Sequence, residues 1–256
     1  MKRACLLVIA LLTLAGCAAS RPPDHERAFS SVAFSPDHSL LAFADAVEIR
    51  VLEVETRALV NVLRQLPQDT EGADPLYFRH GAGDTMVFLD NHRIATTGMG
   101  GLVSIWDIRS GSRLSVIDPP TAEVFASTLD FSPFANRLIV GTGDGEILLA
   151  HLSGDVAGPL VPVALTFRPE ACIRSVAISP DGQTIVSTTK GPSHNVMAVI
   201  DRASDKVVDK WKTDVYVCDM EFSPDGKYLL TANATGVLIY DTVDWKKTNL
   251  KDIGAK

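Results

Sequence analysis

The sequence has few aromatic residues, a deficit of basic residues and no apolar run of membrane-spanning length. Of its 256 residues 7% are aromatic, and 31 Asp and Glu outnumber 24 Lys and Arg, for a formal net charge of −7. A nucleic-acid-binding protein needs a basic face that releases counterions, so nucleic acid is not expected as a partner. A transmembrane helix needs about 20 consecutive apolar residues, and no such stretch occurs. No segment keeps a helical period either, so a helical fold is not expected.

The N-terminus carries the most specific local pattern. Lys2 and Arg3 precede an apolar run from Ala4 to Ala15, which ends in Leu14-Ala15-Gly16-Cys17. A short positive start and a short apolar run are typical of a secretory signal. The last four residues resemble the bacterial lipobox. That resemblance implies that the Cys17 thiol receives a diacylglyceryl group and that signal peptidase II cuts just before it; an ordinary signal peptide that leaves Cys17 a free thiol is the alternative.

Three segments follow from this pattern. Residues 1–16 are expected to be a lipoprotein signal peptide, residues 17–28 a polar, lipid-anchored tether, and residues 29–253 the folded domain. Removal of residues 1–16 leaves 22 basic against 31 acidic residues, a formal net charge of −9. Ala18 stands where an Asp would resemble the inner-membrane retention signal. We therefore expect a protein anchored by acyl chains in the bacterial cell envelope, at the outer membrane and facing the periplasm.

The folded domain repeats a turn pattern at a nearly constant period. Phe34, Phe131, Ile178 and Phe222 each precede a Ser-Pro turn, and Phe88 marks a worn copy without the proline. Successive members of this series, Phe34, Phe88, Phe131, Ile178 and Phe222, are 54, 43, 47 and 44 residues apart. Pro presets φ for a type I turn, and Ser and Asp bond back to the backbone. The period is that of one four-stranded blade, and we expect the aligned apolar residues to be buried at equivalent places.

Each unit contains further strand patterns after its turn. Third strands are expected at Glu48–Glu53, Leu102–Asp107, Glu146–His151, Val196–Asp201 and Gly236–Asp241. Weaker fourth strands are expected at Leu59–Leu63, Arg113–Ile117, Leu160–Leu165, Lys206–Lys210 and Trp245–Leu250. Period-2 alternation and β-branched residues support these assignments.

The repeated Phe-Ser-Pro-Asp-Gly, with Ile105-Trp106-Asp107 and Ile239-Tyr240-Asp241, resembles the WD-repeat β-propeller family over about residues 29–250. The resemblance implies an all-β, WD-repeat-like propeller with about five recognisable four-stranded blades; a sixth made from diverged segments is the alternative. The Gly-His pair of many family members is absent. The Trp-Asp end is intact only at Trp106-Asp107, so the tetrad that locks each blade in the family is incomplete here.

Few residues suggest chemistry. The six histidines form no pair at metal-ligand spacing, no nucleophile motif is present, and we expect no catalytic residue, metal or cofactor. Cys172 and Cys218 open the first strands of consecutive units, offset by two residues and so on the same strand face. Export places them in an oxidising compartment, so they form either a disulfide or two buried thiols.

The expected function is that of a non-catalytic, lipid-anchored interaction module that binds a protein partner of unknown identity. The segment from Gln65 to Asp84 is about ten residues longer than a blade requires, and it contains Tyr77, Phe78 and Arg79, residue types that often anchor interfaces. Alternatively, Tyr77 and Phe78 belong to a first strand. The alternative function is a periplasmic propeller enzyme or sugar-binding protein with its site in the central channel. Acidic or His side chains converging there would favour it, and the sequence shows none.

Overall fold

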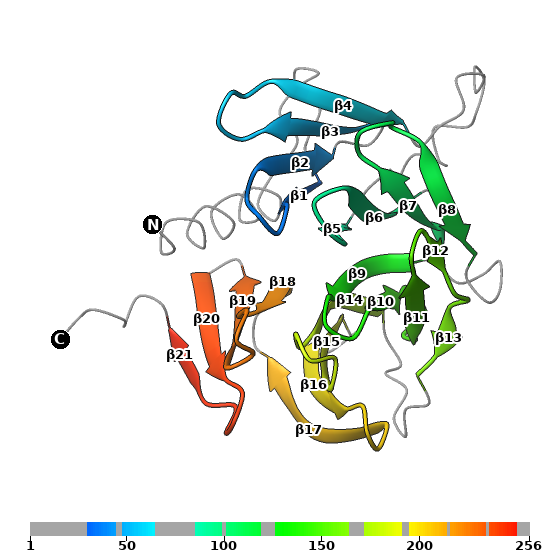
Figure 1. Cartoon of the computed structure of the whole chain (residues 1–256). Helices are drawn as coiled ribbons and strands as arrows, with labels where there is room; N and C mark the ends of the chain where they lie inside the picture. Colours follow the sequence, from blue (N-terminus) through cyan, green and yellow to red (C-terminus); the bar gives the residue numbers. More distant parts are fainter. Residues whose placement is uncertain are drawn as a thin grey trace, which may run out of the picture.

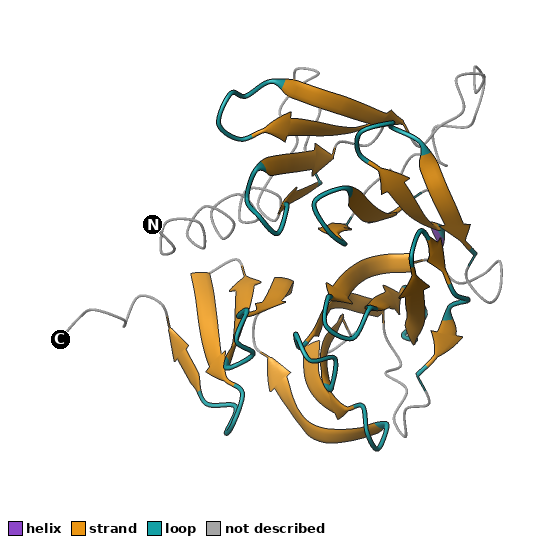
Figure 2. Ribbon diagram, viewed as in Figure 1, coloured by secondary structure: helices purple, strands orange, loops and turns teal. Residues whose placement is uncertain are grey.

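The computed structural model describes residues 30–44, 48–64, 85–98, 101–118, 126–163, 172–190, 195–213, 216–233 and 236–249. These residues form five antiparallel sheets arranged as the blades of a β-propeller (Figures 1 and 2). In every blade the first three strands lie side by side in the order in which they occur in the chain. Five blades, not six, are therefore present.

The strand bounds are as follows. Blade 1 contains β1 (Ser31–Phe34), β2 (Leu40–Ala44), β3 (Glu48–Glu53) and β4 (Leu59–Arg64), and blade 2 contains β5 (Met86–Phe88), β6 (Arg93–Thr97), β7 (Val103–Asp107) and β8 (Arg113–Ile117). Blade 3 contains β9 (Ala126–Ser132), β10 (Arg137–Thr142), β11 (Ile147–Ser153), β12 (Val156–Ala157) and β13 (Val161–Pro162). Blade 4 contains β14 (Cys172–Ile178), β15 (Thr184–Lys190), β16 (Asn195–Asp201) and β17 (Lys206–Thr213). Blade 5 contains β18 (Val217–Phe222), β19 (Tyr228–Asn233), β20 (Gly236–Asp241) and β21 (Lys247–Asn249).

The expected third and fourth strands are largely confirmed, to within a few residues at their ends. Blade 3 differs, because two short strands, β12 and β13, both pair with β11 where one fourth strand was expected at Leu160–Leu165. Gly158 lies between them, and its N–H bonds the His151 carbonyl. No helix in the described part of the chain is long and apolar enough to cross a membrane.

Alternation of side chains along the innermost strand of each blade builds the core. Phe88, Phe131, Ile178 and Phe222 each pack toward the preceding blade, within four apolar clusters that join blades 1 and 2, 2 and 3, 3 and 4, and 4 and 5. Successive strand residues point to opposite faces. The residue before each aligned position therefore faces the following blade, as Ala33, Val87 and Ala177 do in the same clusters.

The junction between blade 5 and blade 1, here called the closing junction, is built differently. Among the described residues no buried apolar cluster joins these two blades. Phe34, which faces this junction, is only half-buried, whereas Phe222 is 7% exposed. The expectation of equal burial is therefore wrong for Phe34. It is also wrong for Phe131, which lies half-buried at the edge of its cluster.

Main-chain hydrogen bonds hold the turns of each blade together. Five equivalent N–H···O bonds of 2.8–3.0 Å join the turn after the third strand to the turn after the first strand, from Val54, Ile108, Leu152, Arg202 and Thr242 to Ser39, His92, Asn136, Gln183 and Lys227. These two sets of turns therefore share one side of the ring, here called the turn face. Inside blade 2, the buried Trp106 Nε1 donates to Thr96 Oγ1 at 3.1 Å, a remnant of the lock that the WD-repeat resemblance implies.

We predict that truncating aligned core residues will have unequal costs. Phe222→Ala removes a ring from a closed cluster and is expected to cost about 3 to 5 kcal/mol of unfolding free energy. Phe34→Ala is expected to cost about half as much, because its ring is half-buried at the closing junction. Equilibrium urea unfolding measures both variants. Equal losses would show that the closing junction is packed as tightly as the others.

Candidate functional site

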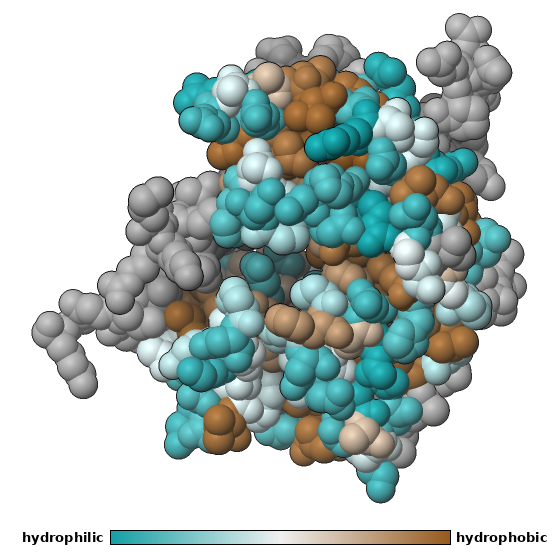
Figure 3. Space-filling view, in the orientation of Figure 1, coloured by the Kyte–Doolittle hydropathy of each residue, from teal (hydrophilic) through white to brown (hydrophobic). Residues whose placement is uncertain are grey.

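Three carboxylates, here called the channel carboxylates, lie on the innermost strands of the ring. The innermost strands β1, β5, β9, β14 and β18 surround the axis, and Figure 3 shows the molecule hollowed near its centre. Asp130 lies on β9, and Asp219 and Glu221 lie on β18. Asp219 and Glu221 are two residues apart and so point to one face of β18, away from blade 4 and toward the closing junction.

Asp130 joins two blades. One carboxylate oxygen accepts the N–H of Ile178 on β14 at 2.8 Å, and the other accepts the N–H of Phe131 at 2.7 Å. Burial nevertheless raises the pKa of Asp130 to about 7, because the lost hydration outweighs both hydrogen bonds, and the negative charges of Glu221 and Asp219 raise it further. The Asp130 carboxyl therefore connects blade 3 to blade 4 and titrates near neutrality.

Asp219 and Glu221 have fewer compensating contacts. Asp219 accepts the N–H of Met220 at 2.9 Å, and its burial raises its pKa to about 6. Desolvation, and then the charge of Asp219, raise the pKa of Glu221 to about 7. The Glu221 side chain still presents exposed surface although protein surrounds it on most sides, as expected at the wall of a narrow channel. Water therefore reaches the carboxylate that lacks a hydrogen-bond partner among the described residues.

The chemistry available to these carboxylates is limited. Raised pKa values let them take up or release protons near neutral pH, and their charges favour a cationic ligand in the channel. On β14 the exposed Arg174 lies over the Tyr216 ring, 5.2 Å from its centroid. Within the described ranges no group of three His, Cys, Asp or Glu side chains could hold a metal ion.

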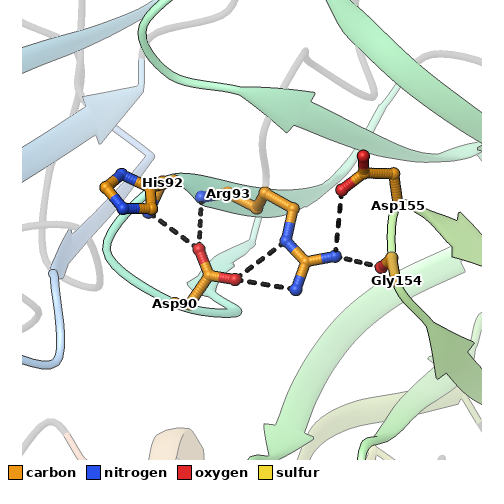
Figure 4. A network of polar contacts seen from close by, with 5 residues as sticks. All are labelled: Asp90, His92, Arg93, Gly154 and Asp155. Atoms are coloured by element: carbon orange, nitrogen blue, oxygen red, sulfur yellow. Dashed lines mark hydrogen bonds and ion pairs between the residues drawn. The ribbon is translucent and has the colours of Figure 1, made fainter.

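A polar network on the turn face joins blades 2 and 3 (Figure 4). Arg93 forms an ion pair with Asp90 at 2.7 Å, and it also reaches the Gly154 carbonyl and Asp155 of blade 3. Asp90 in turn accepts the N–H groups of His92 and Arg93. Each partner is accounted for by turn geometry or blade contact, so we assign this network to stability.

Several large apolar side chains of the described residues are exposed. Those on outer strands include Leu59, Val60, Leu114, Val116, Val161 and Val208. On the turn face Phe134 is 80% exposed and Val243 is 91% exposed, while Val54 is 41% exposed. By contrast, Trp211 packs against Tyr240 and Trp245, with ring centroids 5.7 and 6.1 Å apart. Trp211 and Trp245 therefore serve packing between blades 4 and 5.

The site residues expected from the sequence fall mostly outside the described ranges. This is so for Cys17 and for Tyr77, Phe78 and Arg79, which stay predictions. The considered bridge between Cys172 and Cys218 is not formed, because Cys172 is a free cysteine. Register explains this: Cys218 occupies the bulge of β18 and is equivalent to Arg174 in the bulge of β14, so Cys172 lies two residues farther along its strand.

Sequence reasoning missed the channel carboxylates. A usable indication was present, since the residue before each aligned apolar position is Ala33, Val87, Asp130, Ala177 or Glu221. In a strand that opens a blade, an acid at a position otherwise filled by Ala or Val faces a neighbouring blade near the axis. The acids that would favour a channel site are therefore present, contrary to the expectation.

We predict that these carboxylates destabilise the fold as pH rises. Their folded-state pKa values lie above the ordinary values of 3.8 and 4.5, so their stabilising contribution is complete below about pH 4 and is lost as pH rises through about 7. Glu221→Gln removes one charge, so its melting temperature should exceed that of the parent at pH 8 and match it at pH 4. Glu55→Gln, in an exposed turn, is the control and should change neither value. A parent protein that becomes more stable than the Glu221→Gln variant as pH rises would contradict the assignment.

Comparison with known proteins supports a WD-repeat propeller. No family model matches the sequence. The chain is 25% identical over 217 residues to periodic tryptophan protein 2 of Arabidopsis thaliana, covering 83% of this chain and 22% of that protein. It is 26% identical over 220 residues to the LST8 homolog of Drosophila melanogaster, covering 83% of this chain and 65% of that protein. The chain thus spans less than two thirds of the length of either relative.

Structural comparison agrees on the fold. Hydrazine synthase of Kuenenia stuttgartiensis superposes with a TM-score of 0.65 at 18% sequence identity, over 91% of this chain and 69% of that chain. At this identity the likeness bears on the fold alone. The two relatives in sequence and the five-bladed ring together support an all-β, WD-repeat-like propeller.

Proposed function

We propose that this chain is a non-catalytic, lipid-anchored interaction module of the bacterial cell envelope that holds a protein partner. The observation that carries the proposal is the ring itself, in which four apolar clusters fix the blades while the turns between strands stay exposed. A rigid scaffold with variable exposed turns is suited to recognition, because little conformational entropy is lost when it binds. The similarity to WD-repeat proteins supports the same function.

The N-terminal pattern supports the anchored location. Leu14-Ala15-Gly16-Cys17 directly follows a short apolar run, and the described domain begins at residue 30, which leaves a polar tether of about a dozen residues. A diacylglyceryl group with a further acyl chain holds a protein on a bilayer stably, whereas one chain binds reversibly. The ring would then lie close to the membrane surface, facing the periplasm.

The channel carboxylates favour a second candidate function. Asp130, Asp219 and Glu221 could receive a cationic small molecule, as in the periplasmic enzyme or sugar-binding protein considered above. The two candidate functions predict that substitutions at different places in the protein abolish function. Loss of function confined to the channel carboxylates would favour the second, and loss confined to exposed turns and loops would favour the first.

We predict that Cys17 is the lipidated first residue of the mature protein. Cys17→Ser removes the thiol that the lipid requires, so the variant is expected to leave the membrane fraction or to retain residues 1–16. Intact mass spectrometry of the detergent-extracted protein measures the added acyl mass. Cys172→Ser is the matched control and should leave the mass of the anchor unchanged. A mature parent protein of unmodified mass would refute lipidation.

We also predict that the Gln65–Asp84 segment contributes to partner binding. Replacement of Tyr77, Phe78 and Arg79 together by Ala is expected to abolish partner capture from detergent-solubilised membranes while the melting temperature stays unchanged. Replacement of the exposed outer-strand residues Leu114 and Val116 by Ala is the control and should keep the partner. If the triple variant melts well below the parent and still holds its partner, the three residues belong to the core.

A further inference from the structure

One turn of the ring departs from the rule that the others follow. In blades 1, 4 and 5 the turn reads Ser-Pro-Asp, and the Asp accepts the hydroxyl of the Ser two residues earlier at 2.5–2.7 Å. The same Asp accepts a backbone N–H two residues later at 3.0–3.2 Å. In blade 2 Asp90 accepts two backbone N–H groups in the same way. Four of the five turns are therefore stabilised by an Asp.

Blade 3 carries Phe134 at this position. Its side chain is 80% exposed and belongs to none of the apolar clusters. A phenyl ring left in water gains nothing from folding, and the turn loses the hydrogen bonds that an Asp would make. Neither the stability of the turn nor packing in the core therefore explains Phe134. Its exposed position suits a contact with another molecule.

The turn that presents Phe134 is held firmly. Ser132 Oγ donates to the Pro180 carbonyl at 2.6 Å, and Arg137 Nη1 donates to the Gly182 carbonyl at 3.3 Å. Ala135 lies so close to blade 4 that a Cβ on Gly182 would be 2.4 Å from the Ala135 Cβ. Gly182 also has φ of +72°, so no other residue would fit there without strain. A ring fixed in this manner loses little entropy on binding.

The exposed carboxylates near Phe134 indicate the kind of partner, since the basic Arg137 beside it is half-buried and bonded to the Gly182 carbonyl. Asp181 lies in the blade 4 turn that touches the Phe134 turn, and Asp155 lies in the blade 3 turn bonded to it through Leu152 and Asn136. Both are exposed, and Asp155 remains 72% exposed despite its contact with Arg93. Over the whole turn face, eight acidic residues stand against five basic ones: Asp37, Glu55, Asp90, Asp155, Asp181, Asp205, Asp225 and Asp244, against Arg57, Arg109, Arg202, Lys227 and Lys246.

We propose that the turn face around Phe134 is a second partner-binding surface, separate from the Gln65–Asp84 segment, and that it takes a protein with an apolar pocket for this ring and Lys or Arg at the pocket rim. The proposal rests on the proposed function as an interaction module. An acidic surface is repelled by anionic lipid headgroups and by the same face of a second copy. A protein surface with an apolar pocket and a basic rim can bury the Phe134 ring and pair with the carboxylates around it.

The test uses the full, membrane-anchored chain with a photo-reactive benzoylphenylalanine at position 134 or, as a control, at position 243. Val243 is 91% exposed in the outer turn of blade 5 on the same face. Irradiation of cells of the source organism is expected to give one discrete protein adduct from position 134 and none from position 243. An adduct with lipid, an adduct with a second copy of the chain, or no adduct from position 134 would each overturn the proposal.

The captured protein is then purified and titrated against variants. Phe134→Asp should weaken its binding at least about 30-fold, as loss of an interface anchor does. The same variant should melt at the parent temperature or above it, because it supplies the Asp of the other turns. Val243→Asp introduces the same charge and should keep the parent affinity. If the captured protein binds Phe134→Asp as well as the parent, the surface is wrong while the binding function itself stands.

Discussion

The alternation of side chains on the innermost strand of each blade is the constraint on which the ring depends. Each of these strands must satisfy two neighbours at once, with one residue against the preceding blade and the next against the following blade. Phe222 and Ala177 meet in the cluster between blades 4 and 5, and Phe88 and Ala33 meet in that between blades 1 and 2. A large residue opposite a small one fills the space between two sheets without a void.

The closing junction is where this constraint is met least well. Blade 5 turns Asp219 and Glu221 toward it, and blade 1 turns the half-buried Phe34 toward it. At the matching position in blade 3, Asp130 accepts the N–H of Ile178 from the following blade, whereas Glu221 accepts no such bond from a described residue. Burial raises the pKa of both carboxyl groups to about 7, so both charges remain costly to the fold. Because the strands of each blade are consecutive in the chain, no strand of the described ranges is exchanged between blade 5 and blade 1 to support this junction.

The sequence predicted the repeating features well because they are local. A Ser-Pro-Asp turn and an alternating strand require only neighbouring residues, so five units, their period and most strand bounds follow from the chain alone. The prediction that Phe34 and Phe131 are fully buried was wrong. The burial of each ring depends on the blade packed against it, and a local sequence pattern does not describe that blade. The two-residue offset between Cys172 and Cys218 also follows from the aligned positions, because the bulges of β14 and β18 lie at equivalent places.

The same distinction separates residues that the fold requires from those it leaves free. Positions between blades are fixed by the shape of two sheets, and a polar group there must find a partner, as Asp130 does. Of the five turns after the first strands, four carry an Asp that the turn itself explains. Phe134 replaces that Asp in a turn that Ser132 and Arg137 bind to blade 4 by other bonds. These bonds to blade 4 replace the stabilising contacts that an Asp would make within the turn. An aromatic side chain can therefore occupy this exposed position without loosening the propeller.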